Sequence, residues 1–325
     1  MSYGKHFPHS MLRVAALLSL LLSAPAVAQE RANGRVDRAA DTRLDNRIDV
    51  VTPMAPELAA FGTHAVGVRT ISVTDASRAD VASAKDGEPT TRTARSLTLE
   101  VWYPAAVSEE ARDGEYRAIM RDPSVVVTLY GRAHRDAALI PADRPFPLLI
   151  LSHGYPGNRY LLSHLGENLA SKGYIVVSID HTGSTYDNAQ AFAVTLYNRS
   201  YDQLFVLNEM ARLGAANSGH FLSGHVDATR TGIVGYSMGG YGLVNVIGGG
   251  YRAAAASFAG APPNQLLLER SADNAAYKAS IDPRIKAAVA IAPWGMQAGF
   301  WDAAGLAGIR TPTLFVAGSA DDVSG

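Results

Sequence analysis

Cysteine is absent from all 325 residues of the chain. That absence excludes disulfide bonds, thiol nucleophiles and cysteine-based metal sites. An excess of charge is lacking too: 29 Lys and Arg stand against 30 Asp and Glu, and there is no long basic stripe. Because nucleic-acid binding depends on a concentrated positive field, this balance gives a nucleic-acid partner little support.

The sequence also lacks an apolar run long enough for a membrane helix, and its apolar segment near the N-terminus is short. Lys5 and Arg13 precede Val14–Ala24, and an Ala-x-Ala sequence ending at Ala28 follows it. This arrangement is typical of a cleavable secretory signal rather than a membrane span. We therefore expect a signal peptide over residues 1–28, cleavage after Ala28, a periplasmic or secreted mature protein, and no stable membrane anchor. An uncleaved anchor is the alternative.

Composition divides the remainder of the chain. Residues 29–60 contain few large apolar side chains before Val50, which is typical of a disordered leader. A single globular domain is expected over residues 61–325. Within it, residues 106–145 hold several Arg and Asp around one β-like run, Val125–Tyr130. We interpret them as an insertion with weak local structure.

Strand patterns begin after the leader. Val66–Val73 and Leu97–Tyr103 alternate between apolar and polar residues, and a polar stretch joins them. This pattern predicts an N-terminal antiparallel hairpin.

Strands and helices then alternate along the chain. Apolar runs predict buried strands, and three-residue apolar spacing predicts helices between several of them. This order indicates an α/β fold with a mostly parallel sheet that is covered on both faces. The strands are expected at 147–152, 174–179, 231–235, 285–291 and 313–317, and the helices at 158–172, 197–213 and 238–247.

One predicted strand runs directly into the sequence Gly235-Tyr-Ser237-Met-Gly239, which is G-x-S-x-G at a strand-to-helix junction. Such a turn is strained and crowded, so its flanking positions must be glycine, and it exposes the serine hydroxyl at the carboxyl edge of the sheet. The positive end of the following helix favours developing negative charge. We therefore predict that Ser237 is a nucleophile, the alternative being a chance match in a chain with 30 glycines.

A second loop supports this prediction. His153-Gly154-Tyr155 follows the strand predicted at 147–152 and precedes a helix. An oxyanion hole needs two preorganised backbone N–H groups, one from the residue after the nucleophile and one from an earlier loop. Met238 and Tyr155 are the expected donors, whereas the His153 side chain is expected to bond locally in a tight turn.

A serine nucleophile also needs a base and an orienting carboxylate, which in this fold follow in the chain order Ser, acid, His. Asp321 lies after the strand predicted at 313–317 and is the chosen acid, with Asp322 as the alternative. All nine histidines precede Asp321. The catalytic histidine, with one more strand and a closing helix, is therefore expected beyond residue 325. Residues 1–325 alone would then lack the base, unless His181 or His225 supplies it in a rearranged order.

These motifs resemble those of a known family. The segments LEVWYP, LSHGYPGNRY, GYSMGG, IAPWG and TPTLFVAGSADD are similar to those of secreted α/β-hydrolases of the platelet-activating-factor acetylhydrolase and dienelactone-hydrolase-like group, near bacterial cutinases and polyester hydrolases. The resemblance implies an α/β-hydrolase fold, ester chemistry without metal or cofactor, and a small, lipid-like or polyester substrate. It also implies that Trp294 lines the substrate cleft, although a tryptophan at a strand end can be purely structural.

The chain departs from this family in three ways. Dienelactone hydrolases proper use a cysteine nucleophile, cutinase-like members usually carry a disulfide near the C-terminus, and the insertion is long for a minimal cutinase. We expect an exported serine esterase that forms an acyl-enzyme. The alternatives are an inactive ester-binding protein, or a serine peptidase or acyltransferase on the same fold.

Overall fold

The computed structural model describes residues 36–37, 46–107 and 114–324. The predicted signal peptide over residues 1–28 and its cleavage site after Ala28 lie outside these residues.

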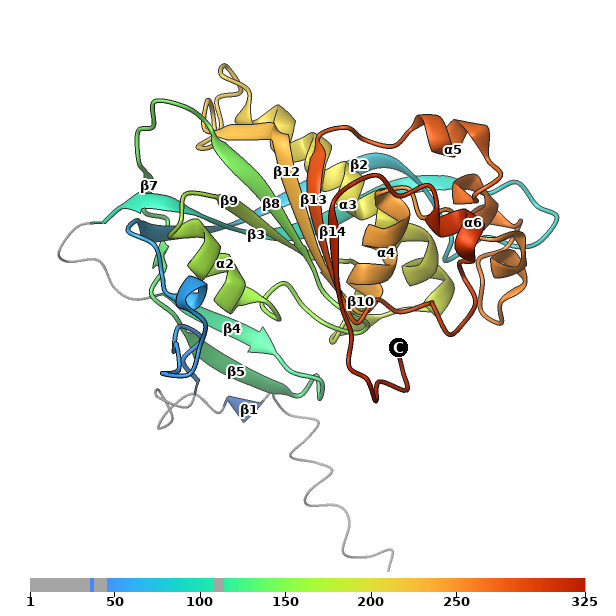
Figure 1. Ribbon diagram of the computed structural model, residues 1–325, viewed down its shortest axis with the longest axis horizontal. Helices are drawn as coiled ribbons and strands as arrows, with labels where there is room; N and C mark the ends of the chain where they lie inside the picture. Colours follow the sequence, from blue (N-terminus) through green and yellow to red (C-terminus); the bar gives the residue numbers. More distant parts are fainter. Residues whose placement is uncertain (1–35, 38–45, 108–113, 325) are drawn as a thin grey trace, which may run out of the picture.

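A nine-stranded mixed sheet forms the centre of the molecule (Figure 1). Its path is β14-β13-β12-β8-β9-β3-β2-β6, with β7 added beside β3, and the five strands from β14 to β9 are parallel to one another. This order confirms the predicted α/β class. The strands are β2 (Ala65–Ala79), β3 (Arg92–Ala106), β6 (His134–Arg135), β7 (Ala138–Leu139), β8 (Phe146–Ser152), β9 (Ile175–Asp180), β12 (Val226–Tyr236), β13 (Ile285–Ile291) and β14 (Thr313–Val316).

The predicted N-terminal hairpin is confirmed. Strands β2 and β3 pair antiparallel over almost their full length, with a register shift between Asp75 and Arg78. Strand β3 then pairs antiparallel with β9, which joins the hairpin to the parallel part of the sheet.

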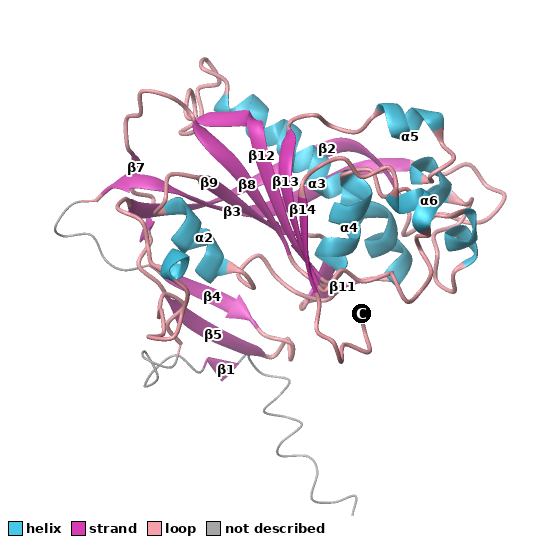
Figure 2. Ribbon diagram, viewed as in Figure 1, coloured by secondary structure: helices cyan, strands magenta, loops and turns pink. Residues whose placement is uncertain are grey.

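Helices cover both faces of this sheet (Figure 2). Alternate residues of β8 show the division: Leu148 and Ile150 belong to the core under α3 and α4, whereas Leu149 and Leu151 belong to the core that contains Trp102. Helix α2 packs on that second face, where Gly166 lies against the Trp102 indole. The helices are α2 (Ser163–Ala170), α3 (Phe192–Gly214), α4 (Met238–Val246), α5 (Ala275–Ala279) and α6 (Ala303–Leu306), with short 3-10 turns η1 (Glu57–Ala59), η2 (Ala253–Ser257) and η3 (Leu266–Arg270).

The expected insertion has more structure than its sequence indicated. Strand β4 (Glu115–Ile119) and strand β5 (Val125–Tyr130) form an antiparallel hairpin, and β1 (Val36–Asp37) adds to β5 as a third strand. The hairpin is held by a buried tyrosine: Trp102 Nε1 donates to the Tyr116 hydroxyl at 2.9 Å. Trp102 belongs to β3 of the central sheet, so the sequence of the hairpin alone could not reveal this contact.

The described part of the expected disordered leader is also partly folded. Ile48 N–H donates to the Tyr130 carbonyl at 2.9 Å, so this segment pairs with the edge of the hairpin. Asp49 is buried and forms ion pairs with Arg47 at 2.7 Å and Arg132 at 3.1 Å. The prediction of disorder over residues 29–60 is therefore wrong for this stretch, because a polar composition can still be ordered by paired charges.

Strand β14 forms one edge of the sheet. Its side chains Leu314, Phe315 and Val316 are 59%, 46% and 44% exposed. The further strand and helix that the sequence predicts would come after this edge, outside the described residues. Among the described helices, none is both long and apolar enough to cross a bilayer.

Candidate active site

Ser237 occupies a strained turn between β12 and α4. Its φ is 52° and its ψ is −115°, a conformation that a residue with a side chain rarely adopts. The turn is held at both sides of the residue: Ser237 N–H donates to the Ile291 carbonyl at 2.9 Å, and its carbonyl accepts from Tyr241 N–H at 2.9 Å. The surrounding structure therefore compensates the strain.

The two glycines of the motif are required by close packing. A Cβ on Gly235 would lie 2.4 Å from the Gly239 carbonyl oxygen, inside the turn itself. A Cβ on Gly239 would lie 2.0 Å from the Ser152 carbonyl oxygen on the neighbouring β8. Both distances are far below contact, so the G-x-S-x-G spacing here is a structural requirement of the turn.

Ser237 is half-exposed, and its hydroxyl forms no hydrogen bond with another described residue. Met238 is the first residue of α4, so its N–H is among those without a partner inside the helix. The positive end of α4 thus begins directly beside the serine. The arrangement fits a nucleophile next to one oxyanion donor.

The loop after β8 approaches the same place. Gly154 lies so close that a Cβ there would be 3.2 Å from the Ser237 Cβ. The loop is tied down by two backbone hydrogen bonds, from Gly157 N–H to the Ser184 carbonyl at 3.2 Å and from Tyr186 N–H to the Gly157 carbonyl at 3.0 Å. Tyr155 follows Gly154, so the second predicted donor also lies beside the serine.

Trp294 lies next to the Ser237 turn. Its N–H donates to the Ser237 carbonyl at 3.1 Å, and its half-buried ring contacts the Phe192 ring at a centroid distance of 5.3 Å. Phe192 in turn contacts Tyr155 at 5.3 Å. These contacts form an aromatic wall that runs from the loop after β8 to the turn after β13. Phe258, Phe300 and Tyr241 also contact Trp294.

Asp321 and Asp322 differ in their surroundings. The Asp321 carboxylate accepts hydrogen bonds from the N–H groups of Val323 at 3.0 Å and Ser324 at 2.8 Å, and it is partly buried. Asp322 is exposed, and only its backbone carbonyl is held, by Gln297 at 3.0 Å. Asp321 follows β14 at the carboxyl end of the parallel strands, the edge at which Ser237 also lies, but no contact joins the two residues.

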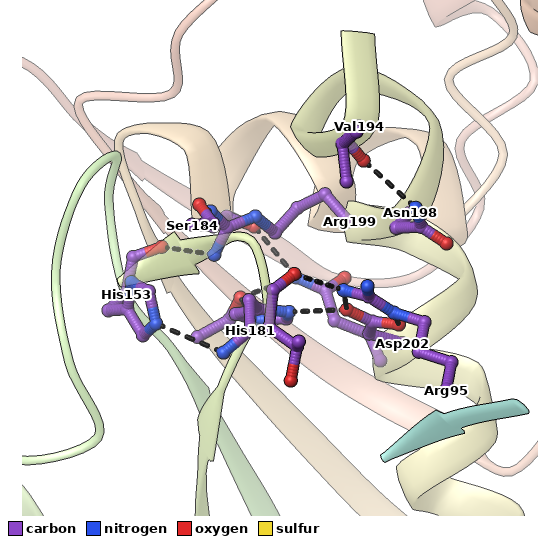
Figure 3. A network of polar contacts seen from close by, with 12 residues as sticks. Arg95, His153, His181, Ser184, Val194, Asn198, Arg199 and Asp202 are labelled. Carbon is purple, nitrogen blue, oxygen red and sulfur yellow. Dashed lines mark hydrogen bonds and ion pairs between the residues drawn. The ribbon is translucent and has the colours of Figure 1, made fainter. Parts of the chain in front are cut away.

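The histidines considered as rearranged bases lie elsewhere. His181 is buried behind the loop, where its Nε2 is 2.8 Å from the Ser152 hydroxyl and its Nδ1 is 3.0 Å from the Asp202 carboxylate (Figure 3). His225 precedes β12 at the opposite end of the sheet from Ser237. No described histidine forms a hydrogen bond with Ser237.

Ser152, His181 and Asp202 have the connectivity of a catalytic triad, but their burial argues against that role. The Ser152 side chain is fully buried, and its hydroxyl also accepts from Gln203 Nε2 at 2.9 Å. A substrate carbonyl has no approach to a hydroxyl in this position. The three residues form an internal polar network beneath the site.

Sequence reasoning missed this network. Asp202 of α3 accepts from Arg78 at 2.8 Å and Arg95 at 2.7 Å, two arginines that come from the β2–β3 hairpin. Burial alone would raise the pKa of Asp202, but Arg95 and His181 outweigh it and hold that pKa well below its ordinary value. Burial, assisted by Arg199, lowers the pKa of His181 to about 3, so its imidazole is neutral. The only sequence signal was a run of polar residues within a helix that is otherwise apolar on its inner face.

A cavity of about 210 Å³ lies between the β4–β5 hairpin and the loop after β8. Ile119 and Val126 line it from the hairpin, and Asn158 and Tyr160 line it from the loop. The insertion therefore contributes to a hollow beside the loop that carries Tyr155. Among the described residues, no group of three or more His, Asp or Glu side chains is placed to hold a metal ion.

Comparison with known proteins gives related ester hydrolases. A family model described as PET hydrolase-like (PETase) matches residues 140–264, a segment that contains Tyr155 and Ser237 but ends before Asp321. Cutinase est1 of Thermobifida alba is 25% identical over 182 residues, which cover 56% of this chain and 45% of that protein. The bis(hydroxyethyl) terephthalate hydrolase of Streptomyces coelicolor is 24% identical over 222 residues, 68% of this chain and 55% of that protein.

The chain spans about half the length of the curated relatives it matches. Among solved structures, a ferulic acid esterase from Streptomyces cinnamoneus has a TM-score of 0.47 and 25% sequence identity, covering 79% of this chain and 66% of that one. The chain is thus similar in sequence to cutinases and polyester hydrolases, and its sheet order, with the serine turn between β12 and α4, is that of an α/β fold.

Proposed function

We propose that this protein is a serine esterase that hydrolyses carboxylic esters through an acyl-enzyme. The observation that carries the proposal is the strained turn of Ser237, which faces the Gly154–Tyr155 loop and begins α4. A strained backbone of this kind persists only where its surroundings enforce it, and it is common at catalytic nucleophiles. The cutinases and the terephthalate-ester hydrolase among the relatives support the same reaction class.

In the proposed reaction, Ser237 Oγ attacks the ester carbonyl and transfers its proton to a base. The carbonyl oxygen becomes an oxyanion, which accepts hydrogen bonds from Met238 N–H and Tyr155 N–H. Collapse of the tetrahedral intermediate releases the alcohol, which takes the proton back from the base. Water then attacks the acyl-enzyme in the same way and releases the acid. This sequence needs no metal or cofactor.

Asp321 is proposed to orient the base. Two backbone N–H groups, from Val323 and Ser324, fix the position of its carboxylate. The base itself is proposed to be the histidine expected beyond residue 325, since His181 bonds to Ser152 and His225 lies at the other end of the sheet.

The aromatic wall supports an apolar substrate group. Trp294, Phe192 and Tyr155 present ring surface between the nucleophile turn and the oxyanion loop. We propose that this wall receives the acyl or aromatic part of a small, lipid-like or polyester substrate. Export to the periplasm or medium, with cleavage after Ala28, completes the proposal. The mass of the mature N-terminal peptide tests that part.

Labelling of the full-length gene product with a fluorophosphonate, followed by peptide mass spectrometry, tests the reaction. We expect the label on Ser237, hydrolysis of p-nitrophenyl butyrate, and loss of both in Ser237→Ala. Ser223→Ala, which changes a hydroxyl at the opposite end of the sheet, should retain both. A folded Ser237→Ala variant with wild-type turnover would disprove the proposal, and ester binding without turnover by the wild type would favour the inactive alternative.

A further inference from the structure

Arg199 is a buried cation without a carboxylate beside it. Its side chain is 1% exposed in the middle of α3, and no described carboxylate lies within ion-pair distance of it. The acid of this region, Asp202, is instead paired with Arg78 and Arg95. Burial lowers the pKa of Arg199 to about 9, so the guanidinium is still charged at neutral pH. A cation kept in such a place is costly unless other polar groups satisfy it.

The two Nη atoms are bound mainly by the loop after β8, whereas Nε has no hydrogen-bond partner among the described residues. Arg199 Nη1 donates to the His153 carbonyl at 2.8 Å, and Nη2 donates to the Ser184 hydroxyl and, at a longer 3.4 Å, to the Gly154 carbonyl (Figure 3). Space for the side chain is left by α4, where a Cβ on Gly242 would lie 2.5 Å from Arg199 Cγ. Arg199 on α3 can therefore extend past Gly242 on α4, and its guanidinium reaches the loop.

The Gly154 carbonyl has a second donor. His153 Nδ1 lies 2.6 Å from it, and His153 Nε2 accepts from His181 N–H at 3.3 Å. These partners assign the proton to Nδ1, which donates to the carbonyl. Burial, reinforced by Arg199, keeps the pKa of His153 well below its ordinary value, so the ring stays in this neutral form.

The peptide between Gly154 and Tyr155 connects these contacts to the chemistry. The bond is trans, since the cis bond of this loop is the following one, Tyr155–Pro156. In a planar trans peptide the carbonyl and the N–H point to opposite sides. A carbonyl held toward Arg199 and His153 therefore turns the Tyr155 N–H away from α3. The positive charge at the carbonyl end also polarises the peptide and strengthens its N–H as a donor.

We propose that Arg199 is a positioning residue for the oxyanion hole, which acts by holding and polarising the Gly154–Tyr155 peptide. This inference rests on the proposed esterase function, in which Tyr155 N–H binds the oxyanion. It assigns to α3 a part in the reaction without placing any of its side chains against the substrate.

Steady-state kinetics of the full-length protein with p-nitrophenyl butyrate test the inference, with Arg199→Met as the main variant. We expect kcat to fall by about 10- to 100-fold, less than the full loss of an oxyanion donor, and KM to change by less than about threefold. The inhibition constant of an alkylboronic acid, whose tetrahedral serine adduct places an oxygen in the hole, should rise by the same factor as kcat/KM falls.

Arg270→Met is the matched control, because Arg270 is also a buried arginine but bonds to Asn245, away from the loop. It should lower the melting temperature without changing kcat. If Arg199→Met does not fold, Arg199→Gln decides, since it removes the charge but keeps an N–H donor. It should still lose several-fold in kcat and in boronate affinity.

A folded Arg199 variant with wild-type kcat and boronate affinity would overturn the positioning role of Arg199. The proposed esterase function would be unaffected by that result. A wild-type protein without turnover or boronate binding would instead remove the proposed function, and the inference with it.

Discussion

Gly154 and Ser237 pack against each other where the loop after β8 meets the turn after β12. A Cβ on Gly154 would lie 3.2 Å from the Ser237 Cβ and 3.3 Å from the Tyr236 ring. Because this contact is tighter than ordinary van der Waals contact, only the absence of a side chain lets the loop come so near. The relationship fixes the spacing between the proposed nucleophile and the proposed oxyanion donor that follows Gly154.

Gly154→Ala should therefore weaken catalysis more than stability. The added methyl group would push the loop outward by a few tenths of an ångström and misalign the Tyr155 N–H, which we expect to lower kcat on the order of 10-fold. Gly224→Ala is the control: its φ of 77° makes alanine unfavourable by about 1 kcal/mol, but no atom lies within 4 Å of the new methyl group. Equal kcat values for the two variants, measured on a small aryl ester, would contradict this account.

Asp321 and Asp322 offer a matched pair of substitutions. Asp321→Asn replaces a carboxylate anchored by two N–H groups. Because Asp321 is the proposed orienting acid, the substitution should lower kcat by about 10³- to 10⁴-fold. Asp322→Asn changes an exposed side chain and should retain near-wild-type turnover. Single-turnover acylation rates of the full-length variants measure the difference. The reverse ranking would assign the acid to Asp322.

Trp294→Ala should affect substrate binding in proportion to the apolar group bound. Loss of the indole from the wall removes apolar contact area, and we expect KM for a butyrate or benzoate ester to rise about tenfold, with a smaller change for acetate. Phe221→Ala removes an aromatic ring that lies between Tyr103 and Arg69 and should leave KM unchanged. If Trp294→Ala changes KM equally for esters of all acyl chain lengths, the acyl group binds away from Trp294.

The neutral His181 makes stability depend on pH. Its pKa is lowered from an ordinary 6.5 to about 3, so below about pH 6.5 the unfolded chain takes up a proton that the folded chain does not. The melting temperature should therefore fall as the pH decreases from about 6.5 toward 3, and His153 adds to this slope in the same direction. Asp202 has a lowered pKa, so its contribution is lost only below its ordinary value of 3.8.

Calorimetry of His181→Gln measures that dependence. The variant should show a shallower decrease in melting temperature over this interval. A wild-type slope in His181→Gln would mean that another group takes up the proton.

Asp202→Asn tests the charge balance of the internal network. It would leave Arg95 buried without its carboxylate and Arg78 with Asp75 alone, and we expect a loss of about 3–5 kcal/mol in the free energy of unfolding. Asp227→Asn breaks the ion pair with the half-exposed Arg230 and should cost less than about 1 kcal/mol. Urea denaturation of both variants gives the comparison, and similar losses would argue that the buried network is not a major source of stability.

The parts of the fold that sequence predicted well are those encoded locally. Strand β9 is buried along almost its whole length and has a continuous apolar run to match, and the glycines beside Ser237 marked a turn that the structure confirms. The placement of Ser237 at the start of a helix followed from the same few residues. The helix predicted from residue 158 begins only at Ser163, because residues 158–162 form turns around Asn158.

The parts that sequence could not give depend on partners far apart in the chain. Asp202 is paired with two arginines of the β2–β3 hairpin, and Arg199 with carbonyls of the loop after β8. A polar residue within a helix gives no sign of whether it faces solvent or a buried counter-charge. The hairpin in the insertion was missed for the same reason, since Tyr116 is ordered by its contact with Trp102.

The pairing of Ile48 and Asp49 with the β4–β5 hairpin has a practical consequence for protein engineering. Affinity tags, fusion partners and protease sites placed upstream of Asn46 would leave that pairing intact. A chain that started at Gly62, where the main domain meets α2, would strip Asp49 from Arg132 and expose the edge of the hairpin at Tyr130. Expression boundaries are thus better drawn before this segment than at the first strand of the central sheet.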